Sequence, residues 1–257
     1  MIINGKKLAQ DIVEELKKLP KSDRMLAAVL VGDNAQSKSF LRQKEKMAQF
    51  LEMPFHLYQF NDSIPEEELI REIKKLGDDP DIGGIIVQLP LPAHYRRDVI
   101  TAVINPRKDI DAITPESKNF ISPLPVEVVK DVLQSVGESL SGKNIAIVGR
   151  GFLVGKPIIE WLEGNNISFE VFHSKSDLTG LKNADIVITG VGRGGLVVSD
   201  MLKKTAGVID FGYDFKDGKI SGDFMPAESF NGWYTPTPGG TGPILVAEIF
   251  KNFYKLN

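Results

Sequence analysis

The first half of the chain alternates between strand and helix patterns of apolar residues. Residues 7–19 have an amphipathic helical pattern that Pro20 ends. Three later segments read as strands, two of them continuous apolar runs and one an alternating run: residues 25–31, 82–87 and 55–60. Two helical patterns lie between them: residues 37–51 and 65–76. The first half therefore predicts a βαβαβ arrangement.

The second half repeats this alternation after a helical pattern at residues 126–136. Four short apolar runs predict strands: residues 145–148, 168–172, 185–189 and 207–211. Four segments between and after them predict helices: residues 156–162, 178–181, 199–202 and 244–254. The order predicts a Rossmann-like parallel sheet, and a polar, proline-bearing stretch places the domain boundary near residue 115.

Composition restricts the kind of protein. The chain has 257 residues, enough for two domains, with 42% hydrophobic and 25% charged residues, as in soluble globular proteins. Its net charge of -3 gives no general attraction to nucleic acid or an acidic membrane. There is no cysteine, and the three histidines lack metal-ligand spacing, so we expect no disulfide and no metal site. Without a signal-peptide pattern or an apolar run of membrane-spanning length, we expect a cytoplasmic protein.

The strand at residues 145–148 runs into a glycine-rich turn with Gly149, Gly151 and Gly155. Glycines allow the backbone to approach a pyrophosphate, and the N–H groups that open the next helix favour an anion. The turn therefore predicts a dinucleotide site, although glycine turns after strands also occur without a ligand. Arg150 within it suits a phosphate or is a surface charge.

The strand at residues 168–172 is followed by His173, Ser174 and Lys175, where an NAD-selective site usually places an acid. Ser174 and Lys175 suit a 2'-phosphate instead, so NADP is the expected cofactor, with NAD possible. Lys175 could also be a surface charge. His173 reads as a hydrogen-bonded edge residue.

Several polar residues stand where the carboxyl ends of the first-half strands are expected. Gln88 precedes two prolines after the third strand, and Asp111 lies in a turn over residues 105–112. Each could bind a ligand or only satisfy backbone groups.

Lys44 lies on or beside the apolar face of its helix, where a snorkelling side chain is the usual outcome. Residues 235–243 read as a rigid linker or as a close approach to a ligand.

Five segments spanning nearly the whole chain form one combined pattern: Val31 and Gly32 through Ser37, Phe40 and Lys44; residues 87–92 (VQLPLP); Pro106 with residues 108–111 (KDID); residues 148–151 (VGRG) with 154–157 (VGKP); and residues 235–243 (TPTPGGTGP). Together they resemble one family, the bifunctional methylenetetrahydrofolate dehydrogenase/cyclohydrolases.

The resemblance implies two α/β domains that face each other across a cleft, in a homodimer. A three-layer folate domain would comprise residues 1–115 and 244–257, because the last helix returns to it. A Rossmann-like dinucleotide-binding domain would comprise residues 116–243.

The resemblance also implies an activity in one-carbon metabolism. The family oxidises 5,10-methylenetetrahydrofolate to the 5,10-methenyl cation with NADP+ and hydrolyses that cation to 10-formyltetrahydrofolate. Three residues fall on catalytic positions: Lys44, Gln88 and Asp111. Five fall on positions expected to bind the folate: Phe40, Leu89, Pro90, Gly239 and Gly240. Eight fall on cofactor positions: Gly149, Arg150, Gly151, Val154, Gly155, Ser174, Lys175 and Tyr213.

Three positions and one segment depart from the family pattern. Phe40 replaces a tyrosine, Ala112 replaces the glycine of an Asp-Gly pair, and Gly151 replaces a serine of the cofactor turn. Residues 122–125 (SPLP) replace a Pro-Cys-Thr-Pro segment. Two other functions therefore stay open: a dehydrogenase whose cyclohydrolase step is weak, and a folate- or nucleotide-binding protein without catalysis.

Overall fold

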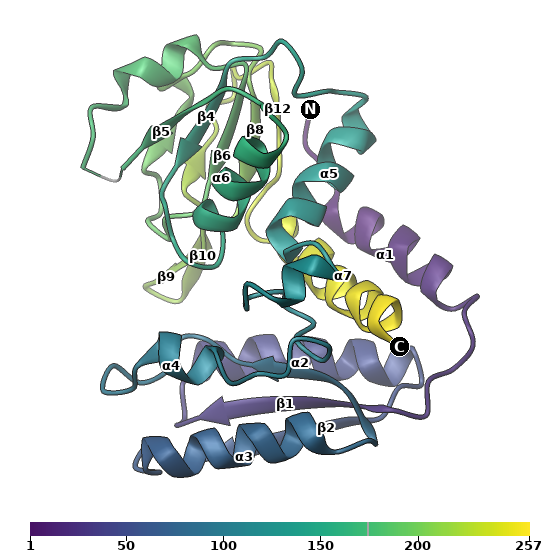
Figure 1. Ribbon diagram of the computed structural model, residues 1–257. Helices are drawn as coiled ribbons and strands as arrows, with labels where there is room; N and C mark the ends of the chain where they lie inside the picture. Colours follow the sequence, from purple (N-terminus) through teal and green to yellow (C-terminus); the bar gives the residue numbers. More distant parts are fainter. Residues whose placement is uncertain (174) are drawn as a thin grey trace. The chain divides into compact units, whose positions relative to one another are not determined.

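The computed structural model describes residues 1–173 and 175–257, and the chain divides into two compact units (Figure 1). Residues Asp11–Leu124 and Val246–Asn257 form one, the three-stranded unit. Residues Met1–Gln10 and Pro125–Leu245 form the other, the five-stranded unit. These bounds differ from the expected ones at the N-terminus, and the chain changes unit after Leu124 rather than near residue 115.

The three-stranded unit contains a parallel sheet of order β2-β1-β3. Its strands are β1 (Met25–Val31), β2 (Phe55–Phe60) and β3 (Ile82–Val87), and its helices include α2 (Ala35–Phe50), α3 (Glu66–Asp78), α4 (Arg97–Thr101) and a 3-10 turn, η1 (Ser117–Asn119). Each predicted strand of the first half is confirmed. The central strand β1 is buried from Leu26 onward, as its unbroken apolar run predicts.

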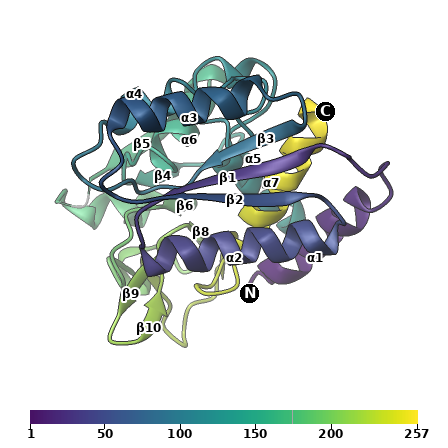
Figure 2. The same ribbon diagram turned by 90° about the horizontal axis from the view of Figure 1, so that it is seen from below.

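Helices cover both faces of this sheet. In both views α2 and α3 lie on opposite sides of β1 (Figures 1 and 2). The apolar face of α3, including Leu69 and Ile73, packs in one core with Ala27 and Val29 of β1 and with Ile100 of α4. The alternation of side chains along β1 thus directs every second residue toward α3.

The last helix, α7 (Thr241–Leu256), completes the three-stranded unit with its residues from Val246 onward. A Cβ atom on Gly84 of β3 would lie 2.8 Å from the ring of Phe253, so this close approach requires glycine. Asn252 is fully buried, and its side-chain amide donates to the carbonyl oxygens of Ile110 and Ser122. The predicted return of the last helix to the first domain is confirmed.

The five-stranded unit contains a parallel sheet of order β12-β8-β6-β4-β5. Its strands are β4 (Ile145–Val148), β5 (Phe169–Phe172), β6 (Ile186–Thr189), β8 (Gly207–Asp210) and β12 (Trp233–Tyr234), and follow this order across Figure 1. Its helical segments are α5 (Leu124–Val136), α6 (Gly155–Gly164), η2 (Leu178–Asn183) and η3 (Ser199–Met201). The Rossmann-like parallel arrangement is confirmed.

Further short strands join the five-stranded unit. Strands β7 (Val197–Val198) and β11 (Phe224–Met225) pair in parallel, and β9 (Asp214–Lys216) and β10 (Lys219–Ser221) form a hairpin. The N-terminus also pairs there, because Ile3 N donates to Tyr234 O and Tyr234 N donates to Met1 O. This pairing explains why the unit includes the first part of α1 (Gly5–Leu16). Among the described residues, no helix is long and apolar enough to cross a membrane.

Candidate active site

Lys44 lies on the buried face of α2. Asn34 caps the start of this helix, with its side-chain oxygen accepting a 2.9 Å hydrogen bond from Ser37 N. Helical spacing then places Ser37, Leu41 and Lys44 on one face, and Lys44 is only 9% exposed. The structure therefore does not support the solvated, snorkelling alternative for Lys44.

Gln88 holds the end of the Lys44 side chain. It follows β3 directly, and its backbone N donates to Val29 O, which extends the pairing with β1. Its side-chain Nε2 donates to Leu89 O at 2.7 Å, which leaves Oε1 to accept a 3.1 Å hydrogen bond from Lys44 Nζ. Leu89 is half-buried and Pro90, joined to it by a cis peptide bond, is exposed.

Asp111 interacts electrostatically with Lys44. Burial raises the pKa of Asp111 to about 6, against the lowering effect of Lys44, and Asp109 raises it further. Burial lowers the pKa of Lys44, and the charge of Asp111 opposes that change. An amine with a lowered pKa can lose and regain a proton closer to neutral pH than an exposed lysine can.

Asp109 is a buried acid to which the sequence assigned no role. It is 0% exposed, and its Oδ2 accepts hydrogen bonds from Thr114 N at 2.7 Å and Ser117 Oγ at 2.8 Å. Burial raises its pKa, although these hydrogen bonds act in the opposite direction. Asp109 fixes the turn that carries Asp111. Its position two residues before another acid was the available sequence signal.

Phe40 is half-buried on α2, one helical turn before Lys44. The structure thus brings Phe40, Lys44, Gln88 and Asp111 together in the three-stranded unit, with Leu89 and Pro90 directly after Gln88. The remaining predicted folate residues, Gly239 and Gly240, belong to the five-stranded unit, just before α7. Gly239 has a φ of 98°, a conformation that favours glycine.

The predicted phosphate turn connects β4 to α6 in the five-stranded unit. Gly149 has a φ of 99°, and a Cβ atom there would lie 2.9 Å from Val191 Cγ2. A Cβ on Gly155 would overlap the carbonyl oxygen of Gly149, so both positions require glycine. Gly151 differs, because its Cβ would meet only Gly190 O at an ordinary 3.7 Å. The two required glycines therefore lie at either end of the turn that leads into α6, as the predicted phosphate turn requires.

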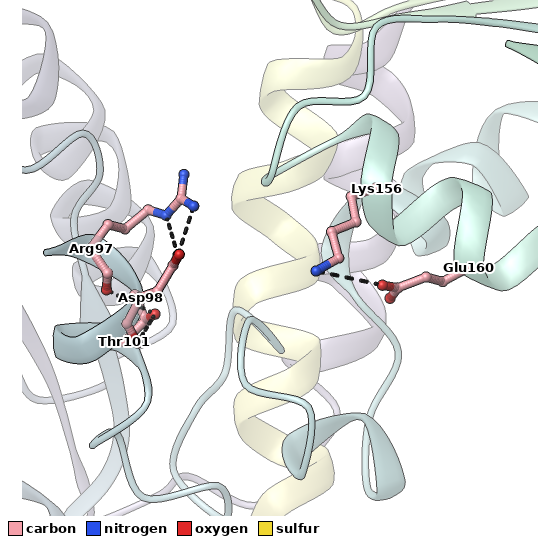
Figure 3. A network of polar contacts seen from close by, with 5 residues as sticks. All are labelled: Arg97, Asp98, Thr101, Lys156 and Glu160. Atoms are coloured by element: carbon pink, nitrogen blue, oxygen red, sulfur yellow. Dashed lines mark hydrogen bonds and ion pairs between the residues drawn. The ribbon is translucent and has the colours of Figure 1, made fainter.

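The charged side chains near this turn are on the surface. Arg150 is exposed. At the start of α6, Lys156 Nζ lies 3.9 Å from Glu160 Oε1, one turn along the same helix (Figure 3). The other cluster in Figure 3 belongs to α4, where Arg97 donates to Asp98 and Thr101 Oγ1 donates to Arg97 O at 3.0 Å. In both clusters the charged side chains are exposed and pair within their own helix, so neither cluster holds a charge toward the turn.

The remaining cofactor positions follow the strands β4, β5 and β8. Val154 is the half-buried residue before α6, and Tyr213 is half-buried after β8. Lys175 is exposed, beside a turn in which His173 N donates to Ser176 Oγ and Ser176 N donates to His173 O. Ser174 lies outside the described residues. The described residues contain no group of His, Asp or Glu side chains that could hold a metal ion.

Two further acids, for which the sequence predicted no role, are buried in the five-stranded unit. Asp210 is 1% exposed and Asp223 is 0% exposed. Asp210 is the last residue of β8, and Asp223 precedes β11. The signal for Asp210 was an acid that ends an apolar strand at the carboxyl edge of the predicted sheet, where ligands bind.

The parallel five-stranded sheet with its glycine turn, and the separate unit with a buried lysine, define a two-unit α/β enzyme of the dinucleotide-binding class. Two family models match. The catalytic domain of tetrahydrofolate dehydrogenase/cyclohydrolase matches residues 3–111, and the NAD(P)-binding domain of the same enzymes matches residues 123–257. The chain belongs to the tetrahydrofolate dehydrogenase/cyclohydrolase family.

Individual relatives are similar over nearly their whole length. A protein named "Bifunctional protein FolD" from Lactobacillus delbrueckii subsp. bulgaricus is 34% identical, with 99% of this chain and 96% of the relative covered. The crystal structure of FolD from Campylobacter jejuni is 31% identical, with a TM-score of 0.92 and coverage of 100% and 98%. The Trypanosoma brucei enzyme, solved with NADP and an inhibitor, is 26% identical, with a TM-score of 0.92 and coverage of 100% and 96%.

Proposed function

We propose that this protein oxidises 5,10-methylenetetrahydrofolate to 5,10-methenyltetrahydrofolate with NADP+ and hydrolyses the product to 10-formyltetrahydrofolate. The observation that carries this proposal is the buried Lys44, hydrogen-bonded to Gln88 at 3.1 Å and coupled to Asp111. A buried amine of lowered pKa suits proton transfer, and this one lies in the region that the catalytic-domain model matches.

In the oxidation, the methylene carbon of the folate loses a hydrogen with its bonding electron pair and becomes the methenyl cation. Bound NADP+ supplies the acceptor for that hydride. Little acid–base chemistry is required of the protein at this step, which depends mainly on alignment. Asp111 would bind the pterin ring by accepting hydrogen bonds from its N–H groups, a role that requires an ionised carboxylate.

In the hydrolysis, water adds to the cationic carbon and loses a proton. Neutral Lys44 would accept that proton. Because Gln88 Oε1 accepts one Lys44 N–H, the amine is held in place while its lone pair stays available. The added hydroxyl group then loses its proton as the C=O bond forms and the bond from the carbon to N5 breaks. N5 takes up a proton, and the formyl group remains on N10.

The cofactor would bind at the turn between β4 and α6. Gly149 and Gly155 have no side chains, so the backbone there can approach the phosphates. Gly155 N–H at the start of α6 would donate to them, since Lys156 N already donates to Gly151 O and Pro157 has no N–H. The exposed Lys175 after β5 would pair with the 2'-phosphate of NADP. Arg150, Val154 and Tyr213 would line the rest of this edge.

We also propose that the enzyme works as a homodimer in the cytoplasm, as its family resemblance implies. Analytical ultracentrifugation at micromolar concentrations would test the dimer, and fractionation of cells that express the chain would test the compartment.

A spectrophotometric assay tests the main proposal. Purified protein is given methylenetetrahydrofolate with NADP+ or with NAD+, and separately methenyltetrahydrofolate without a cofactor. We expect oxidation that is faster with NADP+ and hydrolysis that is faster than in buffer. Equal or better turnover with NAD+ would overturn the role of Lys175.

Phe40 favours one alternative, a dehydrogenase with a weak cyclohydrolase step, because the family tyrosine hydroxyl is missing there. Oxidation with hydrolysis no faster than in buffer would establish that alternative. A chain that binds folate or NADP+ but catalyses neither step would be the non-catalytic homologue.

A further inference from the structure

The acid pair, Asp210 and Asp223, ties together loops that follow the strands of the five-stranded sheet. Asp223 accepts three hydrogen bonds, each 2.7 Å long. The donors are Thr189 Oγ1 and Val191 N, which share Oδ2, and Arg193 N, which uses Oδ1. Asp223 therefore fixes the conformation of the segment that leaves β6.

Asp210 fixes the neighbouring segments. Its carboxylate accepts from Gly212 N at 2.7 Å, Asp223 N at 3.2 Å and Phe224 N at 3.0 Å. Burial raises its pKa to about 7, and the charge of Asp223 adds to that effect while the backbone donors oppose it. The carboxyl groups of Asp210 and Asp223 therefore need not both be ionised near neutral pH.

The segment held by Asp223 packs against the glycine turn. A Cβ on Gly149 would lie 2.9 Å from Val191 Cγ2, and a Cβ on Gly190 would lie 2.6 Å from Val154 Cγ1. Residues 190 and 191 therefore form one wall of the turn between β4 and α6. The hydrogen bond from Val191 N to Asp223 holds this wall in place.

We propose that Asp223, oriented by Thr189 and by the backbone, is a positioning residue for the dinucleotide site. It acts through the Val191 segment and does not itself touch the cofactor. The inference rests on the proposed function, because it assigns the cofactor to the glycine turn. This role requires an acid at position 223, because both carboxylate oxygens accept hydrogen bonds from donors whose positions are fixed.

Asparagine cannot replace Asp223 without loss. Its single oxygen can face either the two donors on Oδ2 or the one on Oδ1, and its NH2 group then opposes the remaining N–H. Valine in place of Thr189 has nearly the same shape and removes one donor, whereas serine keeps the hydroxyl. These substitutions separate the hydrogen bond from the volume of the side chain.

The test uses the full-length chain carrying Asp223→Asn, Thr189→Val, Thr189→Ser or, as a matched surface control, Asp200→Asn. Asp200 is exposed in η3. The dissociation constant of NADP+ is measured by calorimetry, and KM is measured for NADP+ and for methylenetetrahydrofolate. Hydrolysis of methenyltetrahydrofolate, which uses no cofactor, is measured on the same preparations, and circular dichroism checks the fold.

We expect Asp223→Asn to raise the dissociation constant of NADP+ about tenfold or more. Thr189→Val should raise it about fivefold. Thr189→Ser should recover most of the affinity lost in Thr189→Val, and Asp200→Asn should match the unmodified chain. KM should rise for NADP+ and not for the folate, with hydrolysis preserved. A purely structural role would instead reduce both reactions together with the stability of the fold.

Unchanged NADP+ affinity in Asp223→Asn, with normal oxidation by the unmodified chain, would overturn the inference and leave the proposed function intact. If Asp223→Asn does not fold, the comparison of Thr189→Val with Thr189→Ser decides, and equal affinities in the two overturn the inference. An unmodified chain that binds no NADP+ would contradict both the proposed function and the positioning role.

Discussion

Lys44 Nζ donates a 3.1 Å hydrogen bond to Gln88 Oε1 across 44 residues of sequence. Burial lowers the pKa of Lys44, and the amide keeps the amine in one place without adding a charge that would reverse this effect. Gln88 therefore fixes the position of the Lys44 amine, and burial lowers its pKa.

Replacing Lys44 by methionine should abolish hydrolysis of methenyltetrahydrofolate, with a loss of about 10²–10⁴-fold. Methionine retains an unbranched side chain on the buried face of α2 but has no amine. NADP+ binding should stay within about twofold, because the proposed cofactor turn belongs to the other unit. Lys46→Met, on the exposed side of the same helix, is the matched control. Full hydrolysis by Lys44→Met would remove Lys44 from the mechanism.

Asp109→Asn should shift the acidic limb of the pH profile to lower pH. The negative charge of Asp109 helps to raise the pKa of Asp111, which stands at about 6. Without that charge Asp111 stays ionised at lower pH, so folate binding should persist further into the acidic range. The asparagine oxygen can still accept from Thr114 N and Ser117 Oγ.

The pH dependence of kcat/KM for methylenetetrahydrofolate measures this shift. Glu116→Gln, an exposed acid in the same loop, should leave the profile unchanged. A shift of the limb to higher pH in Asp109→Asn would contradict the electrostatic account.

Ala112→Gly should be nearly neutral for stability. Ala112 has a φ of 53°, in the left-handed region, which costs an L-residue about 1–2 kcal/mol. Relief of that strain offsets a loss of about 1 kcal/mol for the buried methyl group and the added flexibility of the unfolded chain. The free energy of unfolding in urea should therefore change by less than about 0.5 kcal/mol.

Ala48→Gly provides the comparison, because Ala48 is fully buried in α2 with ordinary helical backbone. It should destabilise the protein by about 1–2 kcal/mol. Equal losses at the two positions would show that the turn at Ala112 stores no strain.

Gly151→Ser should tighten NADP+ binding. A Cβ at this position meets only Gly190 O, at 3.7 Å, so the side chain fits, and its hydroxyl could donate to a phosphate. One such hydrogen bond contributes about 1 kcal/mol, or a roughly fivefold lower Kd. Calorimetry would measure the change. Gly164→Ser, at the far end of α6 with open space around it, should leave the Kd unaltered.

The regular part of the fold was predictable from sequence because apolar runs record burial directly. Strands β1 and β3 match their runs residue for residue, at Met25–Val31 and Ile82–Val87. The hairpin of β9 and β10 was not predicted, since its three-residue strands are polar and largely exposed. The backbone pairing of Ile3 with Tyr234 could not be predicted either, because nothing in the sequence near either residue specifies so distant a partner.

The candidate site was only partly predictable for the same reason. Helical spacing placed Lys44 beside an apolar face, but spacing cannot distinguish a snorkelling lysine from one that is 9% exposed. Asp223 gave no periodic signal, since its donors lie 30 to 34 residues away in other loops.

The contact between Gly84 and Phe253 has a consequence for biosynthesis. On the ribosome, residues 11–124 emerge long before α7, and Asn252 meets Ile110 across a separation of 142 residues. The apolar surface around Gly84 in the nascent three-stranded unit therefore stays uncovered until α7 has been synthesised. Most of the five-stranded unit is synthesised during that interval.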